Sequence, residues 1–312
     1  MNARPQAAAV ILVGAGAAGL SCALWLQSHD VPFRWLDACG RVGGTLHRVH
    51  HPVENYPGWM GATGAALAQQ MAEQVARRGL LVERAFVECV DPAAGRVYVA
   101  GEAWLDCDSM VLATGTSPRR LALPGEAELE GRWIFHSSHV LAPSVRGARV
   151  LVVGGGDGAF EAALVLARAG AAVTLIHRSR SLRRVRARFA ADVAANPAIE
   201  VVLGAQVRAW EVQGDALTAT LDLAGQRTVR SFAAAVLKIG VVPNLPAVAQ
   251  EVTRDASGHL VVDGLGRTTL PGLFAIGDVA ANRVQSVATA AAQGAIVADV
   301  IAASWLARGD AL

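Results

Sequence analysis

The stretch that most constrains the fold of this chain is an apolar run that stops at a glycine-rich turn. Ala8–Val13 is apolar throughout, and Gly14–Gly19 reads Gly-Ala-Gly-Ala-Ala-Gly. An Ala- and Leu-rich segment follows as far as Gln27, and a second apolar run, Pro32–Leu36, ends at Asp37. This order predicts a strand, a tight turn, a helix and a second strand, a unit whose helix N-terminus faces the pyrophosphate of a bound dinucleotide.

The glycines and the acid of this unit have separate roles. The first glycine makes the turn, the second lets the backbone approach the pyrophosphate, and the third lets the helix pack on the strand. Asp37 lies 23 residues after Gly14, where a carboxylate can accept the hydroxyls of an adenosine ribose. We therefore expect an unphosphorylated adenosine here. The predicted contacts in the turn are Gly14, Gly16, Ala17, Ala18 and Gly19.

A second copy of the pattern begins at a strand predicted for Arg149–Val153. It continues through Gly154–Ala159, a helix of about Phe160–Ala169, and a strand, Ala172–Ile176, that ends at His177. His177 again lies 23 residues after the first glycine of its turn, but the acid is missing. The chain is therefore expected to hold a second dinucleotide with a different ribose.

Basic residues stand where the second copy lacks its acid. Arg178 follows His177, and Arg183 comes soon after. A ribose 2′-phosphate is repelled by a carboxylate, whereas guanidinium groups bind it bidentately, so the second site should prefer NADPH. Arg186 and Arg188 are interpreted as the solvated face of a helix. The predicted contacts are Gly154, Gly156, Asp157, Gly158, Ala159, His177, Arg178 and Arg183.

Composition and charge exclude several function classes. The 312 residues are 53% hydrophobic with a net charge of +2, which suits about two domains and gives no general attraction to nucleic acid. Four cysteines, Cys22, Cys39, Cys89 and Cys107, lie far apart. Their spacing disfavours a disulfide framework, a zinc site and a redox dithiol, and favours a reducing cytoplasm.

Two local features of the sequence allow more than one interpretation. The apolar stretch Ala7–Leu26 could be a signal peptide or a membrane span, but glycines interrupt it at turn positions, so we interpret it as a buried strand and its helix. His47, His50 and His51 are close in sequence. Because only Glu54 stands nearby as a further ligand, a loop around a cofactor is favoured and no metal site is expected.

A third informative region lies near the C-terminal end. A strand, Leu273–Ile276, leads to Gly277 and Asp278, and a long Ala-rich helix begins at about Ser286. If the first cofactor is a flavin, the positive end of this helix lies near the pyrimidine side of the flavin ring and stabilises negative charge there. Asp278 could accept a hydroxyl of the ribitol chain, or it could brace the turn.

The order of these motifs resembles that of the low-molecular-weight thioredoxin reductases and their relatives. The resemblance covers nearly the whole chain. The motifs that carry it are Gly14–Gly19 with Asp37, Gly43-Gly44, Val53–Gly58, Ala113–Gly115, Gly154–Ala159 with Glu161, His177-Arg178 with Arg183, Ile239–Asn244 and Gly277-Asp278.

The resemblance implies an α/β fold of two Rossmann-like dinucleotide-binding domains, a homodimer, and the cofactors FAD and NADPH. A discontinuous FAD domain, residues 1–117 and 244–312, would contain the NADPH domain, residues 118–243, as an insertion. Thr114–Pro118 and Val241–Asn244 would be the crossovers. The resemblance adds these cofactor contacts: Gly44, Thr45, Asn55, Ala113, Thr114, Gly115, Ile239, Gly240, Gly277, Asp278, Gln285 and Ser286.

The chain departs from this family where the family carries its redox-active cysteines. Thioredoxin reductases have a C-x-x-C pair followed by an acid shortly before the second glycine-rich turn. The corresponding residues here are Ser137, Val140 and Leu141, and none of these can form a disulfide or supply the acid. Direct reduction of thioredoxin by the family mechanism is therefore not expected. His136 and His139 occupy the same region and are candidate proton donors, or else surface residues.

Several electron acceptors remain open. A ferredoxin- or flavodoxin-like carrier or a small oxidant is favoured, because carrier reductases of this type share the scaffold without the cysteine pair. The stretch Phe135–His139 resembles part of the flavin-containing monooxygenases, which favours oxygen. An external disulfide is the third acceptor. A non-catalytic flavin-binding sensor is the alternative from another class. No membrane partner is expected.

Overall fold

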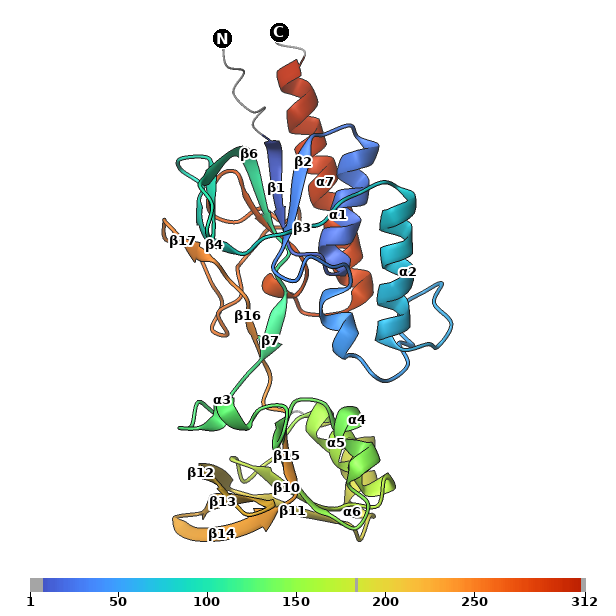
Figure 1. Ribbon diagram of the computed structural model, residues 1–312, viewed down its shortest axis with the longest axis vertical. Helices are drawn as coiled ribbons and strands as arrows, with labels where there is room; N and C mark the ends of the chain where they lie inside the picture. Colours follow the sequence, from blue (N-terminus) through green and yellow to red (C-terminus); the bar gives the residue numbers. More distant parts are fainter. Residues whose placement is uncertain (1–7, 183–184, 310–312) are drawn as a thin grey trace. The chain divides into compact units, whose positions relative to one another are not determined.

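The structure is a computed structural model that describes residues 8–182 and 185–309. It divides into two units, with the boundaries between Ser117 and Pro118 and between Val241 and Val242. The second boundary lies two residues before the one expected from the sequence. There, strand β16 (Val241–Pro243) pairs with β7 (Thr116–Pro118), so the outgoing and returning crossovers form a two-stranded sheet (Figure 1).

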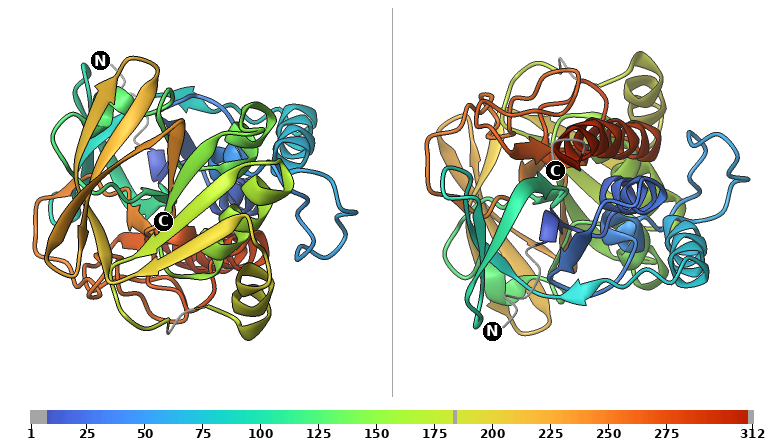
Figure 2. Two further views of the ribbon diagram at one scale, coloured as in Figure 1. Left: turned by 90° about the horizontal axis from the view of Figure 1, so that it is seen from below. Right: turned by 90° about the horizontal axis from the view of Figure 1, so that it is seen from above.

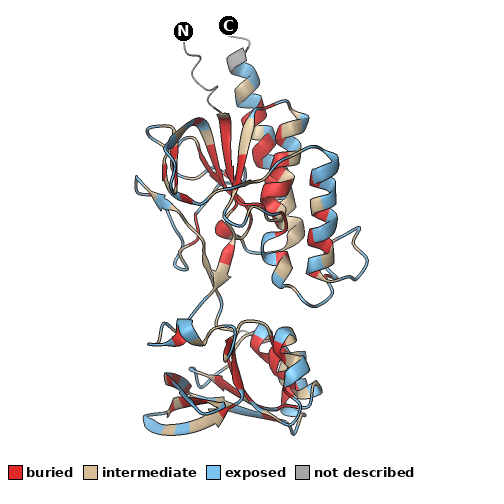
Figure 3. Ribbon diagram, in the orientation of Figure 1, coloured by how far each residue is buried: buried red, intermediate tan, exposed pale blue. Residues whose placement is uncertain are grey.

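The sheet of the first unit is built from both ends of the chain. Strand β1 (Ala8–Val13) lies between β6 (Trp104–Leu112) and β2 (Phe33–Asp37), parallel to both. Strand β18 (Leu273–Ala275) pairs parallel to β6, and β3 (Glu83–Arg84) pairs parallel to β2. Figure 3 shows that the central strands are buried, as continuous apolar runs in parallel sheets require.

The chain crosses from one side of this sheet to the other between two neighbouring short strands. Residues 83–91 form β3 beside β2 and, on the opposite side of the sheet, β4 (Val87–Asp91) beside β5 (Arg96–Val99). The chain leaves the first edge after the N–H of Ala85 donates to the carbonyl of Asp37. Strands β4, β5 and β6 are antiparallel, and β17 (Ala247–Val248) adds to β4.

The α-helices in the described part of the first unit are α1 (Ala17–Ser28), α2 (Gly64–Arg77) and α7 (Val287–Gly309). Helices α1 and α7 lie side by side (Figure 2). A Cβ on Gly294 would come 2.4 Å from the carbonyl oxygen of Ala18, so only glycine allows this approach. Among the described helices, α7 is long and apolar enough to cross a membrane by length and composition, but such a helix is weak evidence of a span when it packs on a neighbour.

The second unit has a five-stranded parallel sheet in the order β11–β10–β9–β15–β8. Three antiparallel strands that the sequence did not predict, β12 to β14, form a separate sheet. The strands are β8 (Ile134–Phe135), β9 (Arg149–Val153), β10 (Ala172–His177), β11 (Ile199–Leu203), β12 (Ala205–Gln213), β13 (Ala216–Leu223), β14 (Gln226–Phe232) and β15 (Ala234–Leu237). The helices are α3 (Glu126–Leu129), α4 (Ser138–Leu141), η2 (Ala142–Ser144), α5 (Asp157–Arg168) and α6 (Ala187–Ala194).

Candidate functional site

The first glycine-rich turn joins β1 to α1 as the sequence predicts. Gly14 has φ +107°, and a Cβ there would lie 2.3 Å from the carbonyl oxygen of Ala113. A Cβ on Gly19 would lie 1.9 Å from the carbonyl oxygen of Gly14. Apart from its immediate chain neighbours, no atom of the described residues lies within 4 Å of a Cβ built on Gly16. The first and third glycines therefore close the turn, and the second borders open space beside the start of α1, where a pyrophosphate fits.

Asp37 is held beside this turn by backbone donors. Its carboxylate accepts the N–H of Ala15 at 3.0 Å, that of Cys39 at 2.8 Å and that of Gly40 at 3.1 Å. These bonds fix the acid at the carboxyl end of β2. A carboxylate offers about four acceptor positions, so it retains capacity for a ribose hydroxyl, and this contact remains a prediction.

Three other predicted residues surround the same turn. Ala113 contacts it from the end of β6, as described above. Gly44 begins the short helix η1 (Gly44–Arg48), and its Cβ would lie 3.0 Å from the Cα of Gly16. Gly277 begins η3 (Gly277–Val279), and its Cβ would lie 2.9 Å from the Cβ of Ala18. Three segments that are distant in the sequence therefore pack against the backbone of the first glycine-rich turn and the start of α1.

Thr114 and Gly115 are bound to the returning crossover by Asn244. The Thr114 hydroxyl donates to the Asn244 carbonyl, and the Asn244 amide donates to the Thr114 carbonyl at 3.1 Å. Asn244 also donates its N–H to Gly115 and accepts from the Ser117 hydroxyl at 2.7 Å. Sequence reasoning placed Asn244 in a crossover but missed this contact, because its partners are distant in the chain.

His259 is a residue near the predicted flavin site that the sequence did not indicate. It is 8% exposed, and its Nε2 lies 3.4 Å from Nε2 of Gln285. Its Nδ1 lies 3.5 Å from a carboxylate oxygen of Asp255. Burial raises the pKa of Asp278, and the positive charge that His259 can carry opposes this.

The remaining predicted contacts of the first site differ in their surroundings. The Ser286 hydroxyl accepts the N–H of Thr289 at 3.2 Å and so caps the start of α7. Thr45, in η1, and Asn55 are exposed. The Nε2 atom of His47 lies 2.8 Å from the carbonyl oxygen of Val42. The described residues contain no group of three or more His, Cys, Asp or Glu side chains placed to hold a metal.

The second glycine-rich turn joins β9 to α5, and the helix begins earlier than predicted. A Cβ on Gly154 would lie 2.3 Å from the carbonyl oxygen of Lys238 and 2.8 Å from the Cβ of Ala159. Helix α5 begins at Asp157, not at Phe160. The predicted contacts Asp157, Gly158 and Ala159 therefore form its first turn, with Gly156 as the N-cap residue.

His177 and Arg178, the residues predicted to contact the ribose of the second nucleotide, lie at the carboxyl end of β10. The imidazole packs over the turn, because a Cβ on Gly155 would lie 2.2 Å from its Nδ1. Burial, and then the charge of Arg178, lower the pKa of His177. The lowered pKa favours the neutral ring at pH 7, so Arg178, which is exposed, is the charged member of this predicted pair of contacts. The predicted contact Arg183 lies outside the described residues.

The sequence suggested that Arg186 is merely a solvated residue, but in the structure it also binds another side chain. Its N–H and its guanidinium each bind the Asp157 carboxylate at 2.7 Å. These contacts lower the pKa of Asp157. These contacts hold Arg186, the residue before α6, against Asp157 at the start of α5. The guanidinium of Arg188 lies 5.2 Å from the ring centre of Phe189.

His136 and His139 have different surroundings within the second unit. His136 is 16% exposed, and its Nε2 lies 2.8 Å from a carboxylate oxygen of Glu130, which also binds Arg120. Its buried Nδ1 has no hydrogen-bond partner among the described residues. His139 lines a hollow of about 420 Å³ with Glu161 and other residues of α5 and α6. A proton-donor role for either histidine remains a prediction.

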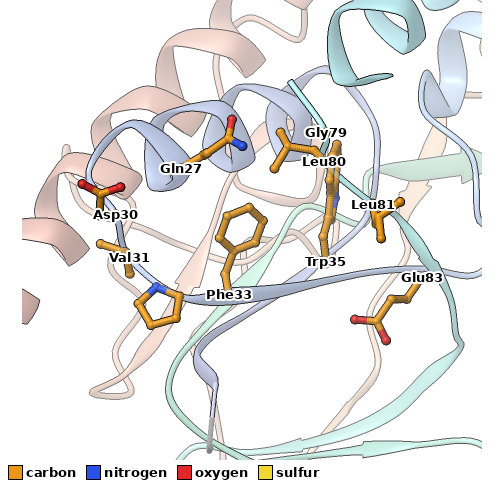
Figure 4. A pocket seen from close by; sticks show the side chains of 10 residues that line it. Gln27, Asp30, Val31, Phe33, Trp35, Gly79, Leu80, Leu81 and Glu83 are labelled. Carbon is orange, nitrogen blue, oxygen red and sulfur yellow. The ribbon is translucent and has the colours of Figure 1, made fainter. Parts of the chain in front are cut away.

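A hollow of about 450 Å³ in the first unit lies away from the glycine-rich turn. It is lined by Gln27, Phe33, Leu80 and Glu83 among others, and Figure 4 shows the ring of Phe33 facing it. Phe33 begins β2, whereas Asp37 ends it. Because these are opposite ends of the strand, this hollow is not part of the candidate cofactor site.

All four cysteines belong to the first unit and are free thiols. Cys22 and Cys107 are buried, Cys89 is partly buried, and Cys39 is exposed. Burial raises the pKa of the Cys22 thiol well above its usual range and that of Cys107 to about 12. These two thiols are therefore protonated and unreactive at neutral pH.

Each of the two units has a glycine-rich turn between a parallel strand and a helix, the arrangement expected of a protein that binds two dinucleotides. Comparison with known proteins gives the family. Residues 8–294 match the model of the pyridine nucleotide-disulphide oxidoreductases. The chain therefore belongs to the pyridine nucleotide-disulphide oxidoreductase family, whose thioredoxin reductase branch comprises NADPH-dependent flavoprotein oxidoreductases, and the predicted class of enzyme and pair of cofactors are confirmed at this level.

Individual relatives agree with this assignment. The thioredoxin reductase of Treponema pallidum is 32% identical, over 95% of this chain and 96% of the relative. That of Peptoclostridium acidaminophilum is 31% identical, over 92% and 93%. The crystal structure of Lactococcus lactis thioredoxin reductase superposes with a TM-score of 0.81 at 26% identity, over 94% of this chain and 97% of that one.

Proposed function

We propose that this protein is an NADPH-dependent flavoprotein oxidoreductase that works without an internal dithiol and passes electrons to an external acceptor. The acceptor is a ferredoxin- or flavodoxin-like carrier or a small oxidant. One observation carries the proposal: residues 118–241, the second unit, contain no cysteine. Ser137 and Val140 occupy the places of the expected pair, before and within the short helix α4.

The residues of the first unit would hold the FAD. The backbone between Gly14 and Gly19 would bind the pyrophosphate, and Asp37 the adenosine ribose. Asp278 and Gln285 would lie along the ribitol and the flavin ring, beside the positive end of α7. When bound, FAD accepts a hydride from NADPH and delivers the electrons onward.

The residues of the second unit would hold NADPH. The turn between Gly154 and Ala159 would receive the pyrophosphate at the start of α5. Arg178 would bind the 2′-phosphate, because a guanidinium offers two parallel donors to a phosphate. The neutral His177 would lie against the adenosine rather than pair with the phosphate.

A thiol relay within the chain is disfavoured by the positions of the four cysteines. Two are buried with raised pKa values. The exposed one, Cys39, donates its backbone N–H to Asp37 and would therefore lie at the adenosine end of the proposed FAD site. The relatives are named thioredoxin reductases, so thioredoxin is the competing acceptor that must be tested directly.

Anaerobic reduction followed by an acceptor screen tests the proposal. NADPH should bleach the yellow FAD-loaded protein under argon, and one-electron acceptors such as ferricyanide or a ferredoxin should restore the colour with turnover. Thioredoxin should give no turnover. If the yellow colour persisted with NADPH, the protein would be a flavin-binding sensor and not a reductase. Turnover with thioredoxin would overturn the dithiol-free mechanism. Rapid reoxidation in air with an oxygenated product would instead favour a monooxygenase.

We also propose a homodimer that covers part of α7. This helix is mostly apolar and carries few charged residues, a composition that is typical of a helix enclosed by other protein. Yet only 28% of its apolar stretch within Val287–Ala307 is buried in the single chain. A second copy of the chain is the occupant that the family resemblance favours. The free thiols suit the cytoplasm.

A further inference from the structure

Lys238 is the only lysine in the chain, and the other 27 of its 28 basic residues are arginine. It is not on an open surface loop. It directly follows β15, at the carboxyl edge of the parallel sheet of the second unit. A chain that uses arginine at every other basic position therefore places its single ammonium group at the edge where nucleotides bind in such sheets.

The backbone of Lys238 forms one side of the second glycine-rich turn. Its N–H donates to the carbonyl of Val153 at 2.8 Å. Its own carbonyl oxygen lies 2.3 Å from where a Cβ of Gly154 would be. The side chain passes the first turn of α5, because its Cδ lies 3.9 Å from a Cβ built on Gly158.

The electrostatic surroundings of Lys238 favour an anion there. Burial lowers the pKa of its ammonium group, and attraction to Glu161 offsets this only in part. No carboxylate of the described residues lies within 4.0 Å of the ammonium nitrogen. The nearby start of α5 adds further positive potential. A phosphate between the ammonium and the helix would neutralise both.

We propose that Lys238 binds the pyrophosphate of the pyridine nucleotide directly. Gly158 has no side chain and so supplies no hydroxyl to that phosphate. The Lys238 side chain passes over the space that a side chain at Gly158 would fill. The compact ammonium of lysine fits beside a tight turn better than a planar guanidinium. The proposal rests on the proposed function only in that the second site must bind a pyridine nucleotide.

This proposal assigns each of two cationic side chains to a different phosphate of the nucleotide. The pyrophosphate is common to NADPH and NADH, so Lys238 should contribute equally to the binding of both. The 2′-phosphate belongs to NADPH alone, so Arg178 should contribute to that nucleotide only. The two residues are therefore distinguished by which nucleotides their loss affects.

Calorimetric titration of the FAD-loaded protein with NADP⁺ and NAD⁺ tests this division. Lys238→Met should weaken both nucleotides by a similar factor, about tenfold or more for the loss of a charged hydrogen bond. Arg178→Ala should weaken NADP⁺ alone. Arg208→Met, which removes a guanidinium paired with Asp222 on another sheet, is the matched control and should change neither.

Two results would overturn the proposal. Unchanged affinities in a folded, flavin-loaded Lys238→Met variant would exclude a contact, and selective loss of NADP⁺ would assign Lys238 to the 2′-phosphate. If the unmodified protein bound neither nucleotide, the proposed function itself would fail. Melting temperature and flavin content show whether each variant is folded.

The single lysine also permits a test without substitution. An amine-reactive reagent can modify only Lys238 and the N-terminal amine, and peptide mass spectrometry separates the two. Saturating NADP⁺ or NAD⁺ should protect Lys238 several-fold, whereas adenosine 2′-monophosphate, which lacks the pyrophosphate, should not. Equal labelling with and without the dinucleotides would contradict the proposal.

Discussion

Asp37 acts at the scale of a single residue on both the turn and the ribose. It accepts three backbone N–H groups, from Ala15, Cys39 and Gly40. Asp37→Ala removes a charged acceptor from all three donors, and such bonds are worth about 1.5–3 kcal/mol each. We expect FAD affinity to fall at least about tenfold, measured as the flavin retained after dialysis. Asp106→Ala, at an exposed site on β6, should retain the flavin; equal retention by both variants would contradict the role of Asp37.

Asp278 gives a pH-dependent prediction. Burial raises the pKa of this acid in the folded chain, so its charged form destabilises the flavin-free protein above the unfolded pKa of about 4. Asp278→Asn should raise the melting temperature of the flavin-free protein at pH 7 by ~1–3 °C. The gain should shrink as the pH falls through the raised pKa and should vanish below about pH 4, where both states hold the proton. A gain that is independent of pH would contradict this assignment.

The sequence located the residues that are close together along the chain, but not those brought in from elsewhere. The spacing from Gly14 to Asp37 correctly predicted that the acid lies beside the first glycine-rich turn, where Ala15 donates to it. His259 and Lys238 were missed, as were the contacts of Asn244, because each of these residues lies beside residues that are distant in sequence. The composition did contain a signal for Lys238, its uniqueness, which only its position beside the second turn makes meaningful.

At the scale of elements, the packing of α1 on α7 depends on Gly294. Alanine would favour the helix by about 1 kcal/mol, but its Cβ would lie 2.4 Å from the carbonyl oxygen of Ala18. Gly294→Ala should therefore lower the free energy of unfolding by ~1–3 kcal/mol, measured by denaturant unfolding.

Gly158→Ala in α5 is the matched control for this substitution. Its Cβ would meet only the Cδ of Lys238, at 3.9 Å. The same exchange should therefore be neutral or stabilising by up to about 1 kcal/mol. Equal effects of the two substitutions would show that helix propensity, not the contact with α1, determines the outcome.

The sequence predicted elements well where an apolar run ends at glycine. Strands β1 and β9 have the predicted bounds, because buried parallel strands are apolar on both faces. Strands β12 to β14 were missed, since polar residues alternate along them and no glycine-rich motif marks them. The start of α5 was misplaced because Asp157 and Gly158 were assigned to the turn alone.

At the scale of the whole molecule, the exposed apolar surface of α7 predicts self-association. Ile296 is 40% exposed on this helix. Light scattering should give twice the mass of one chain, and Ile296→Arg should shift it toward a single chain, because a buried unpaired charge is costly. Val229→Arg, at a 64% exposed position on β14, should leave the mass unchanged. A single-chain mass for the unmodified protein would contradict the homodimer.

The central claim is that the flavin is the only redox centre in the chain. Anaerobic titration with NADPH tests it most directly, because the equivalents consumed count every group that accepts electrons. One NADPH per bound FAD, unchanged when Cys22, Cys39, Cys89 and Cys107 are all replaced by alanine, is the predicted result. Consumption of a second equivalent that disappears in the cysteine-free variant would reveal a dithiol and contradict the account.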